Sequence, residues 1–146
     1  MGTYSFMDVT ASLVGPTGVI DLGAGSANGD AGIKVDMAGP KNSMTVGIDG
    51  EVMHNLSPAK NGTITVTLMK TSPVNKKLMQ AYNAQTLSAS LWGNNTIVVR
   101  NSASGDVLTA RSVAFSQLPG NSNGKDAGSM DWKFDCGKID QFLGEF

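Results

Sequence analysis

The chain has 146 residues, with eleven basic and twelve acidic side chains and a formal net charge of −1, which excludes binding to nucleic acid or anionic lipid through overall charge. Its single cysteine excludes internal disulfides and cysteine-rich metal sites. Segment 1–13 has no basic start with an apolar run, and no stretch approaches the roughly 20 apolar residues of a membrane span. We therefore expect a single domain, residues 1–146, made and kept in the cytoplasm.

Strict alternation of apolar and polar residues predicts strands along much of the chain. Residues 33–37 and 44–48 alternate in this way, so each is expected to form a strand with one buried face. The strongest pattern spans residues 62–70, where β-favouring threonines alternate with aliphatic residues. The threonines are Thr63, Thr65 and Thr67, and the aliphatic residues are Ile64, Val66 and Leu68.

The last predicted strand covers residues 130–136. One of its faces carries Met130, Trp132, Phe134 and Cys136, and the other carries Asp131, Lys133 and Asp135. Such a strand has one face in the core and the other in water or in an interface.

Turns and a helix separate these strands. Asp49-Gly50 suits a two-residue type I′ turn, and residues 102–105 are expected to join strands 96–101 and 106–117. A helix is predicted near residues 73–85, with Ser72 as its N-cap and Pro73 in its first turn. Its buried stripe follows helical spacing and comprises Val74, Leu78, Ala81, Tyr82 and Gln85. The glycine-rich stretch 23–32 and the polar stretch 119–128 are expected to be surface loops.

No motif predicts catalysis, a metal site or a cofactor site. Residues 23–29 have the wrong glycine spacing for a phosphate-binding loop and precede a predicted strand, where such a loop needs a helix. His54 has no recognisable nucleophile motif beside it and is expected in a loop or interface. Cys136 shares an apolar strand face, which predicts a buried, protonated thiol. Asp131 and Asp135 are expected roughly 13 Å apart, too far for paired-carboxylate glycoside hydrolysis.

Several stretches are distinctive when the chain is read from end to end. They are Met53-His54-Asn55-Leu56, the strand-to-helix junction from Gly62 to Asn75, Leu78-Met79, Tyr82-Asn83, Tyr4-Ser5-Phe6, and Trp132-Lys133-Phe134-Asp135. In these residues the chain resembles, over nearly its whole length, the tail-tube protein family of contractile-tailed bacteriophages. The junction from Leu68 to Asn75 is the most specific part of the resemblance.

The resemblance implies a mainly β fold like that of phage tail tubes and the type VI secretion inner tube. Two packed antiparallel sheets would form a sandwich or barrel with one flanking helix near residues 73–85. Six subunits would form a ring, and rings would stack into a hollow conduit for DNA passage during ejection. An extended loop or hairpin, here residues 39–61, would reach the neighbouring ring.

The resemblance also implies partners and a location. The partners would be further copies of the chain, the tail sheath, baseplate and tail-terminator proteins, and the tape-measure protein and genomic DNA in the lumen. The expected location is the tail of the virion, after assembly in the host cytoplasm. No cofactor, catalytic site or membrane contact is expected.

Two sets of residues are candidates for these roles. A conduit that lets DNA slide should have a polar to acidic bore, because each basic contact to phosphate adds salt-dependent attraction. Lumen candidates are Thr63, Thr65, Thr67, Asp131 and Asp135, although the sequence leaves open whether these or their alternates face inward. Candidates for the contact between rings are Met44, Val46, Ile48, Asp49, Gly50, Glu51, Met53 and His54.

Two alternatives remain at this point. One is the inner tube of a phage-derived contractile injection particle, such as a tailocin, whose subunits would be very similar. The other is a monomeric β-sandwich module that binds carbohydrate, with Trp92 or Tyr82 in a sugar platform. Because Tyr82 falls on the helix stripe, only Trp92 is free for that role.

Overall fold

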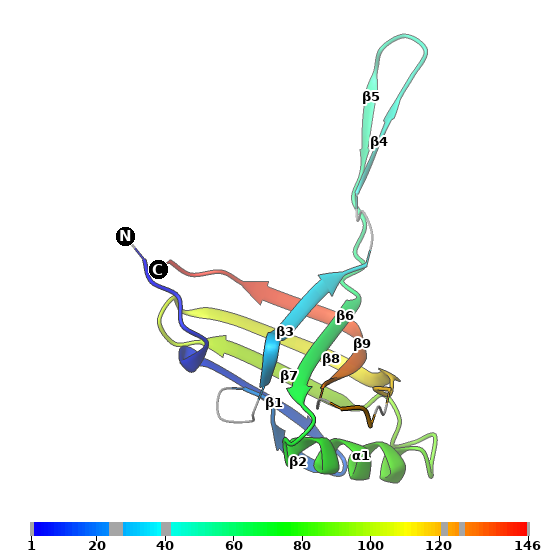
Figure 1. Cartoon of the computed structure of the whole chain (residues 1–146). Helices are drawn as coiled ribbons and strands as arrows, with labels where there is room; N and C mark the ends of the chain where they lie inside the picture. The colour runs from blue at the N-terminus through cyan, green and yellow to red at the C-terminus, as the bar shows by residue number, and fades with distance from the viewer. Residues whose placement is uncertain (1, 24–27, 39–41, 121–122, 126–127, 146) are drawn as a thin grey trace.

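The computed structural model describes residues 2–23, 28–38, 42–120, 123–125 and 128–145. Its described residues form a seven-stranded antiparallel sheet, a separate two-stranded sheet, one α-helix and one short 3-10 helix (Figure 1). The prediction of a mainly β fold with antiparallel sheets and one flanking helix is confirmed.

The large sheet has the strand order β2-β1-β7-β8-β9-β6-β3. In that order the strands are Gly18–Asp21, Val9–Gly15, Asn95–Asn101, Asp106–Gln117, Ser129–Phe142, Gly62–Met69 and Asn28–Met37. The predicted hairpin across residues 102–105 is confirmed by the pairing of β7 with β8. The sequence patterns missed β1 and β2, and β3 begins at Asn28, inside the stretch expected to be a loop, with a register shift before Ile33.

The two longest strands bend together, which lets the sheet fold over its own core. Buried positions are three residues apart in both strands at this point, at Ala110 and Val113 in β8 and at Cys136 and Ile139 in β9. Between them, Ser112 adopts a left-handed φ of 53°. A Cβ at Gly137 would lie 2.9 Å from the Cβ of Ser112, so the bend needs glycine there. Such irregularities allow strands to turn between packed layers.

One contiguous core lies inside this fold. The inward residues of β6 and β9, including Ile64, Val66, Trp132 and Phe134, are fully buried and cluster with the inward residues of β1 and β7. The predicted inner and outer faces of β6 and β9 are therefore confirmed, except that Thr67, on the outer face, is buried at 7% exposure. Phe115 of β8 joins the core, with its ring centroid 5.0 Å from that of Phe134.

Helix α1, Val74–Gln85, packs against this core next to β2 (Figure 1). It begins one residue later than predicted, so that Pro73 and not Ser72 is the N-cap residue, and the Ser72 hydroxyl accepts a hydrogen bond from the Val74 N–H at 3.3 Å. The predicted stripe is confirmed, because its members are buried except for Tyr82, which is half-buried. The helix is also tied to β9, because the indole N–H of Trp132 donates to Asn75 Oδ1 at 3.0 Å.

Candidate functional site: a projecting hairpin and a polar sheet face

A two-stranded hairpin projects from one end of the sheet (Figure 1). Its strands are β4, Ser43–Val46, and β5, Val52–Asn55, and they pair only with each other in the described part of the chain. Both strands are exposed along their whole length. The expectation that residues 44–48 form a strand with one buried face is therefore wrong, because β4 ends at Val46, the hairpin extends beyond the core, and no element among the described residues covers either of its faces.

The turn of this hairpin differs from the predicted one. Gly50 N donates to the Gly47 carbonyl at 3.0 Å, and Gly47 N donates to the Glu51 carbonyl at 2.6 Å. Gly50 has a left-handed φ of 90°. These features define a three-residue connection, a type I turn followed by a left-handed glycine, and not a two-residue type I′ turn. Asp49 Oδ1 accepts from Glu51 N at 3.1 Å, which stabilises the longer turn.

All eight candidates for the contact between rings lie on this hairpin. The cross-strand register groups Met44, Val46, Val52 and His54 on one face and Thr45 and Met53 on the other. The two valines and two methionines of these strands are between 50% and 58% exposed, and Ile48 at the tip is fully exposed. An isolated two-stranded hairpin is only marginally stable in water. Apolar side chains concentrated on it therefore indicate a surface that another protein covers.

The base of the hairpin is fixed to the sheet by residues that the sequence patterns did not single out. The Lys60 carbonyl accepts a hydrogen bond from Ile139 N at 2.7 Å, and Lys60 Nζ lies 3.2 Å from Asp140 Oδ1. The hydrogen bond from Lys60 lowers the pKa of the Asp140 carboxyl below its ordinary value. On the other side of the base, Ala38 N donates to the Asn61 carbonyl at 3.1 Å. The hairpin therefore leaves the body of the protein at a defined place.

The five lumen candidates lie on the outer face of β6 and β9, where Thr67 is buried and the other four are partly or fully exposed. The register places Thr63 opposite Asp135 and Thr67 opposite Asp131. Thr67 Oγ1 donates to Asp131 Oδ1 at 2.8 Å. Thr65 lies between the other two threonines and faces Lys133 across the strands.

The same face continues onto β3, which contributes two charged residues that sequence reasoning did not include. Asp36 lies opposite Thr63 and Lys34 lies opposite Thr65. The outer face therefore carries cross-strand rows of charge. In order, these rows are Asp36-Thr63-Asp135, Lys34-Thr65-Lys133 and Thr67-Asp131. We call the eight residues of these rows the polar face, which carries three aspartates and two lysines.

The remaining residues that could carry chemistry are the cysteine and the histidine. Burial raises the pKa of the Cys136 thiol to about 11, so the predicted buried, protonated thiol is confirmed. His54 is exposed on β5, opposite Met44. In the part of the chain that the structure describes, no group of three or more His, Cys, Asp and Glu side chains is arranged to hold a metal ion. The same part contains no helix both long enough and apolar enough to cross a membrane.

Trp92 is 36% exposed and packs beside two other aromatic rings. Its ring centroid lies 5.9 Å from that of Tyr82 in an edge-on arrangement and 6.4 Å from that of Phe115. Its side chain therefore belongs to an aromatic cluster on the outside of the core. The aromatic spacing along the sequence does not reveal this three-dimensional contact.

Comparison with known proteins agrees with this geometry. Residues 1–144 match the family described as bacteriophage PhiTE tail tube protein. The chain belongs to this family. As a tail tube protein it is a structural component of phage tails. No curated protein matches it by sequence.

Solved structures share the fold of this tail tube protein at low sequence identity. A chain of the PVC sheath-tube complex, an extracellular contractile injection system, is 11% identical with a TM-score of 0.63, covering 97% of this chain and 92% of that one. The PVC sheath/tube terminator is 12% identical with a TM-score of 0.63, with coverages of 97% and 98%. The tube-terminating cap of the anti-feeding prophage is 7% identical with a TM-score of 0.57, with coverages of 99% and 93%.

Proposed function

We propose that this tail tube protein assembles into six-fold rings that stack into a hollow conduit, through which DNA passes during ejection. The observation that carries the proposal is the projecting hairpin, whose apolar side chains are exposed and are covered by no element in the part of the subunit that the structure describes. An extended apolar element of this kind fits a subunit that is completed by copies of itself. Assembly would take place in the host cytoplasm, and the finished tube would lie in the virion tail.

The polar face supports a position around the bore. Its outer residues are threonine, aspartate and lysine, with one more acidic than basic side chain. A surface of this kind would not hold DNA by phosphate contacts, because its net charge repels the phosphates. In this arrangement the lining would comprise Thr63, Thr65, Thr67, Asp131 and Asp135, as the sequence predicted, together with Lys34, Asp36 and Lys133.

The open edges of the sheet support lateral assembly within a ring. Strands β2 and β3 stand at the two ends of the strand order, and each is paired on one side only among the described residues. Exposed strand edges readily pair with other chains, and a closed ring removes them. Beyond further copies of itself, the proposed partners are the tail sheath, the baseplate, the tail terminator, and the tape-measure protein inside the tube.

A second candidate is the inner tube of a phage-derived contractile injection particle. It is favoured by one observation, that the structures sharing this fold include chains from an extracellular contractile injection system and from the anti-feeding prophage. The two candidates differ in the particle to which the tube belongs. Capsid and DNA-packaging genes beside the gene for this chain would favour the complete phage.

Removal of the hairpin tests the proposal. We replace residues 43–57 with a short Gly-Ser linker and compare the variant with the unmodified chain by negative-stain electron microscopy and circular dichroism. The unmodified chain should form hollow tubes with six-fold end views, and the variant should fold but form none. The fold should survive because neither hairpin strand contributes to the buried core. Tubes that persist without the hairpin would contradict its role.

A matched variant separates the apolar surface from the backbone of the hairpin. Met44, Val46, Val52 and Met53 are all changed to threonine, which keeps the strand preference and removes the apolar surface. Tube formation should be lost here as well. Unmodified protein that stays a single particle at high concentration would end the proposal as a whole.

A further inference from the structure

We propose that the tip of the β4-β5 hairpin docks into the groove between strand β2 and helix α1 of a second copy of this chain, in the next ring. This inference rests on the proposed function and names the receiving surface for the ring-to-ring contact. It is carried by the positions of the two surfaces, their opposite charge, and the exposed isoleucine at the tip.

The two surfaces lie at opposite ends of the subunit (Figure 1). Strand β6 runs between them: the hairpin leads into its first residue, Gly62, and helix α1 follows its last residue, Met69. Seven steps along a strand separate these ends by about 23 Å, and the hairpin extends about 20 Å further to its tip. A hairpin therefore cannot reach the groove of its own subunit. In a head-to-tail stack, however, the hairpin end of one subunit faces the α1 end of another.

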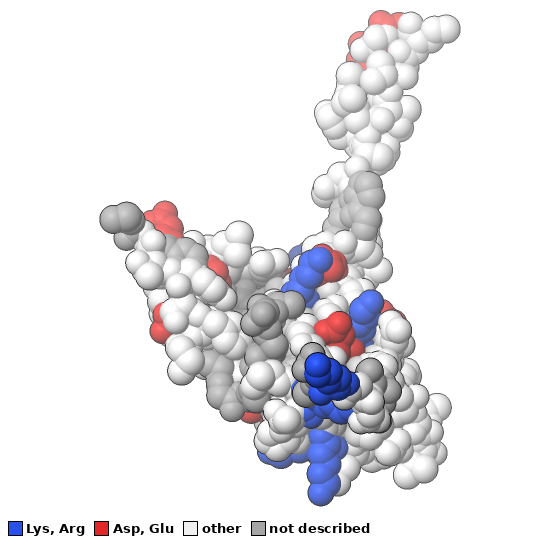
Figure 2. All heavy atoms as spheres, viewed as in Figure 1, with Lys and Arg blue, Asp and Glu red and all other residues white. Residues whose placement is uncertain are grey.

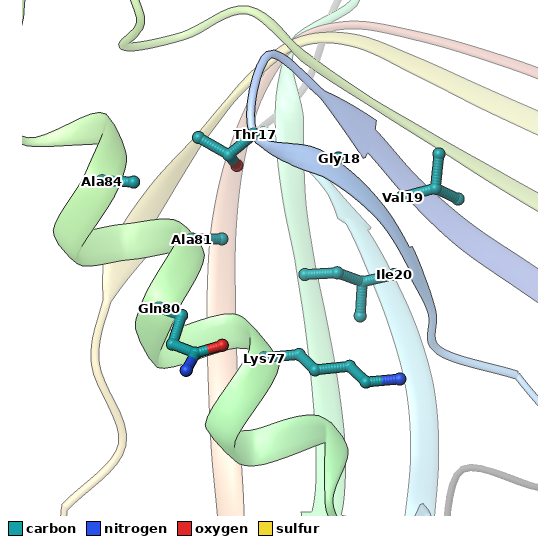
Figure 3. Close-up of a pocket in the computed structure, with 8 residues that line it drawn as sticks. All are labelled: Thr17, Gly18, Val19, Ile20, Lys77, Gln80, Ala81 and Ala84. Atoms are coloured by element: carbon teal, nitrogen blue, oxygen red, sulfur yellow. The ribbon is translucent and has the colours of Figure 1, made fainter.

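The groove has an apolar floor and a polar rim (Figure 3). Its volume is about 330 Å³, within the range of pockets that hold small ligands or side chains. Ile20 of β2 and Ala81 and Ala84 of α1 supply apolar surface, while Lys77 extends from the helix toward β2 and Gln80 lies beside it. Val19, at the edge strand, is 69% exposed. The groove is thus open to a partner with an apolar centre and polar flanks.

The hairpin tip has that composition. Ile48 is fully exposed in the turn, and Asp49 and Glu51 follow it in the sequence. Placing Ile48 on the floor formed by Ile20 and the alanines would remove apolar surface of both partners from water. The acidic side chains beside it would then face the rim that carries Lys77.

The charges of the two elements are opposite in sign. Residues 42–57 include Asp49 and Glu51 and no lysine or arginine, whereas residues 74–85 include Lys76 and Lys77 and no aspartate or glutamate. Figure 2 shows acidic side chains at the end of the hairpin and basic ones at the opposite end, over α1. Within the described part of one subunit, neither the tip acids nor Lys77 form an ion pair. A contact between copies would bring these unpaired charges together and orient the encounter.

Charge reversal at the groove is the first test. Lys77→Glu places a like charge against the tip and should reduce pelleted tubes by about tenfold at low salt. Lys76→Glu is the matched control, because it makes the same charge change one residue earlier on the helix, at a side chain that does not line the groove. The control should keep tube formation near the level of the unmodified chain. Equal losses in both variants would overturn the inference.

A compensating change makes the test specific. Adding Glu51→Lys to Lys77→Glu should restore tubes, because the ion pair reforms with its charges exchanged. Glu51 is chosen over Asp49 because the Asp49 carboxylate accepts a hydrogen bond from the backbone of the turn. Circular dichroism melts show whether each variant is folded. A folded double variant that still lacks tubes would count against the proposed pairing.

Cross-linking tests the contact without relying on charge. In a chain carrying Ile48→Cys and Ala84→Cys, the two thiols cannot meet within one subunit, but oxidation of assembled tubes should join one copy to the next. A ladder of covalent multimers on a non-reducing gel is expected, whereas Ile48→Cys paired with Lys138→Cys, outside the groove, should give none. Tubes that assemble but give no ladder would overturn this inference and leave the proposed function standing. Absence of tubes from the unmodified chain would overturn both.

Discussion

The buried amide pair Gln85-Asn95 should contribute a measurable share of stability, because it ties helix α1 to strand β7. Both side chains are 1% exposed. Gln85 Nε2 donates to Asn95 Oδ1 at 2.9 Å, and Asn95 Nδ2 donates to Gln85 Oε1 at 2.7 Å. Asn95 Nδ2 also donates to the Val113 carbonyl at 3.0 Å, and Gln85 Nε2 donates to Thr17 Oγ1 at 3.2 Å. The pair thus joins the helix, two strands of the sheet and the turn between β1 and β2.

Gln85→Leu removes both bonds of the pair and leaves the Asn95 Oδ1 atom buried without its partner. A buried polar group left unsatisfied costs about 1 to 3 kcal/mol. The loss is larger because Asn95 Nδ2 also loses the Gln85 Oε1 acceptor, although it keeps its bond to the Val113 carbonyl. The added apolar surface of leucine offsets part of the loss. We expect the free energy of unfolding to fall by about 3 kcal/mol, which lowers the Tm of a chain of this size by roughly 10 °C.

The measurement is a double-mutant cycle by thermal and urea unfolding, followed by circular dichroism. Protein concentration is held constant, because assembly links stability to concentration. The double variant Gln85→Leu/Asn95→Leu should lose less than the sum of the single variants, with a coupling energy of about 1 to 2 kcal/mol. Strictly additive losses would refute the reasoning, because the two amides would then contribute independently.

Two further predictions concern the buried thiol and the polar face. Cys136 should resist alkylation in the folded chain at pH 8 and react only on unfolding, and rapid modification of the folded protein would contradict this. Because the pKa of its thiol rises from 9.0 to about 11 on folding, its contribution to stability is intact below pH 9 and is lost as the pH rises toward 11. Assembled tubes of the Asp131→Lys/Asp135→Lys variant should retain short DNA at low salt and release it as salt rises. Tubes of the control variant Glu145→Lys should not retain DNA. Equal retention by both variants would place the polar face outside the bore.

Parts of this fold can be read from local pattern alone. The faces of β6 and β9 follow from two-residue alternation over seven or more residues. This signal is local, so it is the same whichever strands pair on either side of them. Helix α1 carries its own start signal in Ser72-Pro73 and its own stripe. Strand β2 lacks a regular pattern and pairs with β1, and β1 in turn pairs with β7, which lies about 90 residues away in the sequence.

The sequence by itself determined that the chain is extended around residues 44 to 46, where β4 lies, and that Thr63, Thr65 and Thr67 share one side of another strand. Only the tertiary structure decided that the first strand has no core behind it and that Lys34 and Asp36 join the threonine face. The physical reason is that alternation is local: it specifies which side chains point the same way. What covers a face depends on register and packing between segments far apart in the chain, which no local pattern contains.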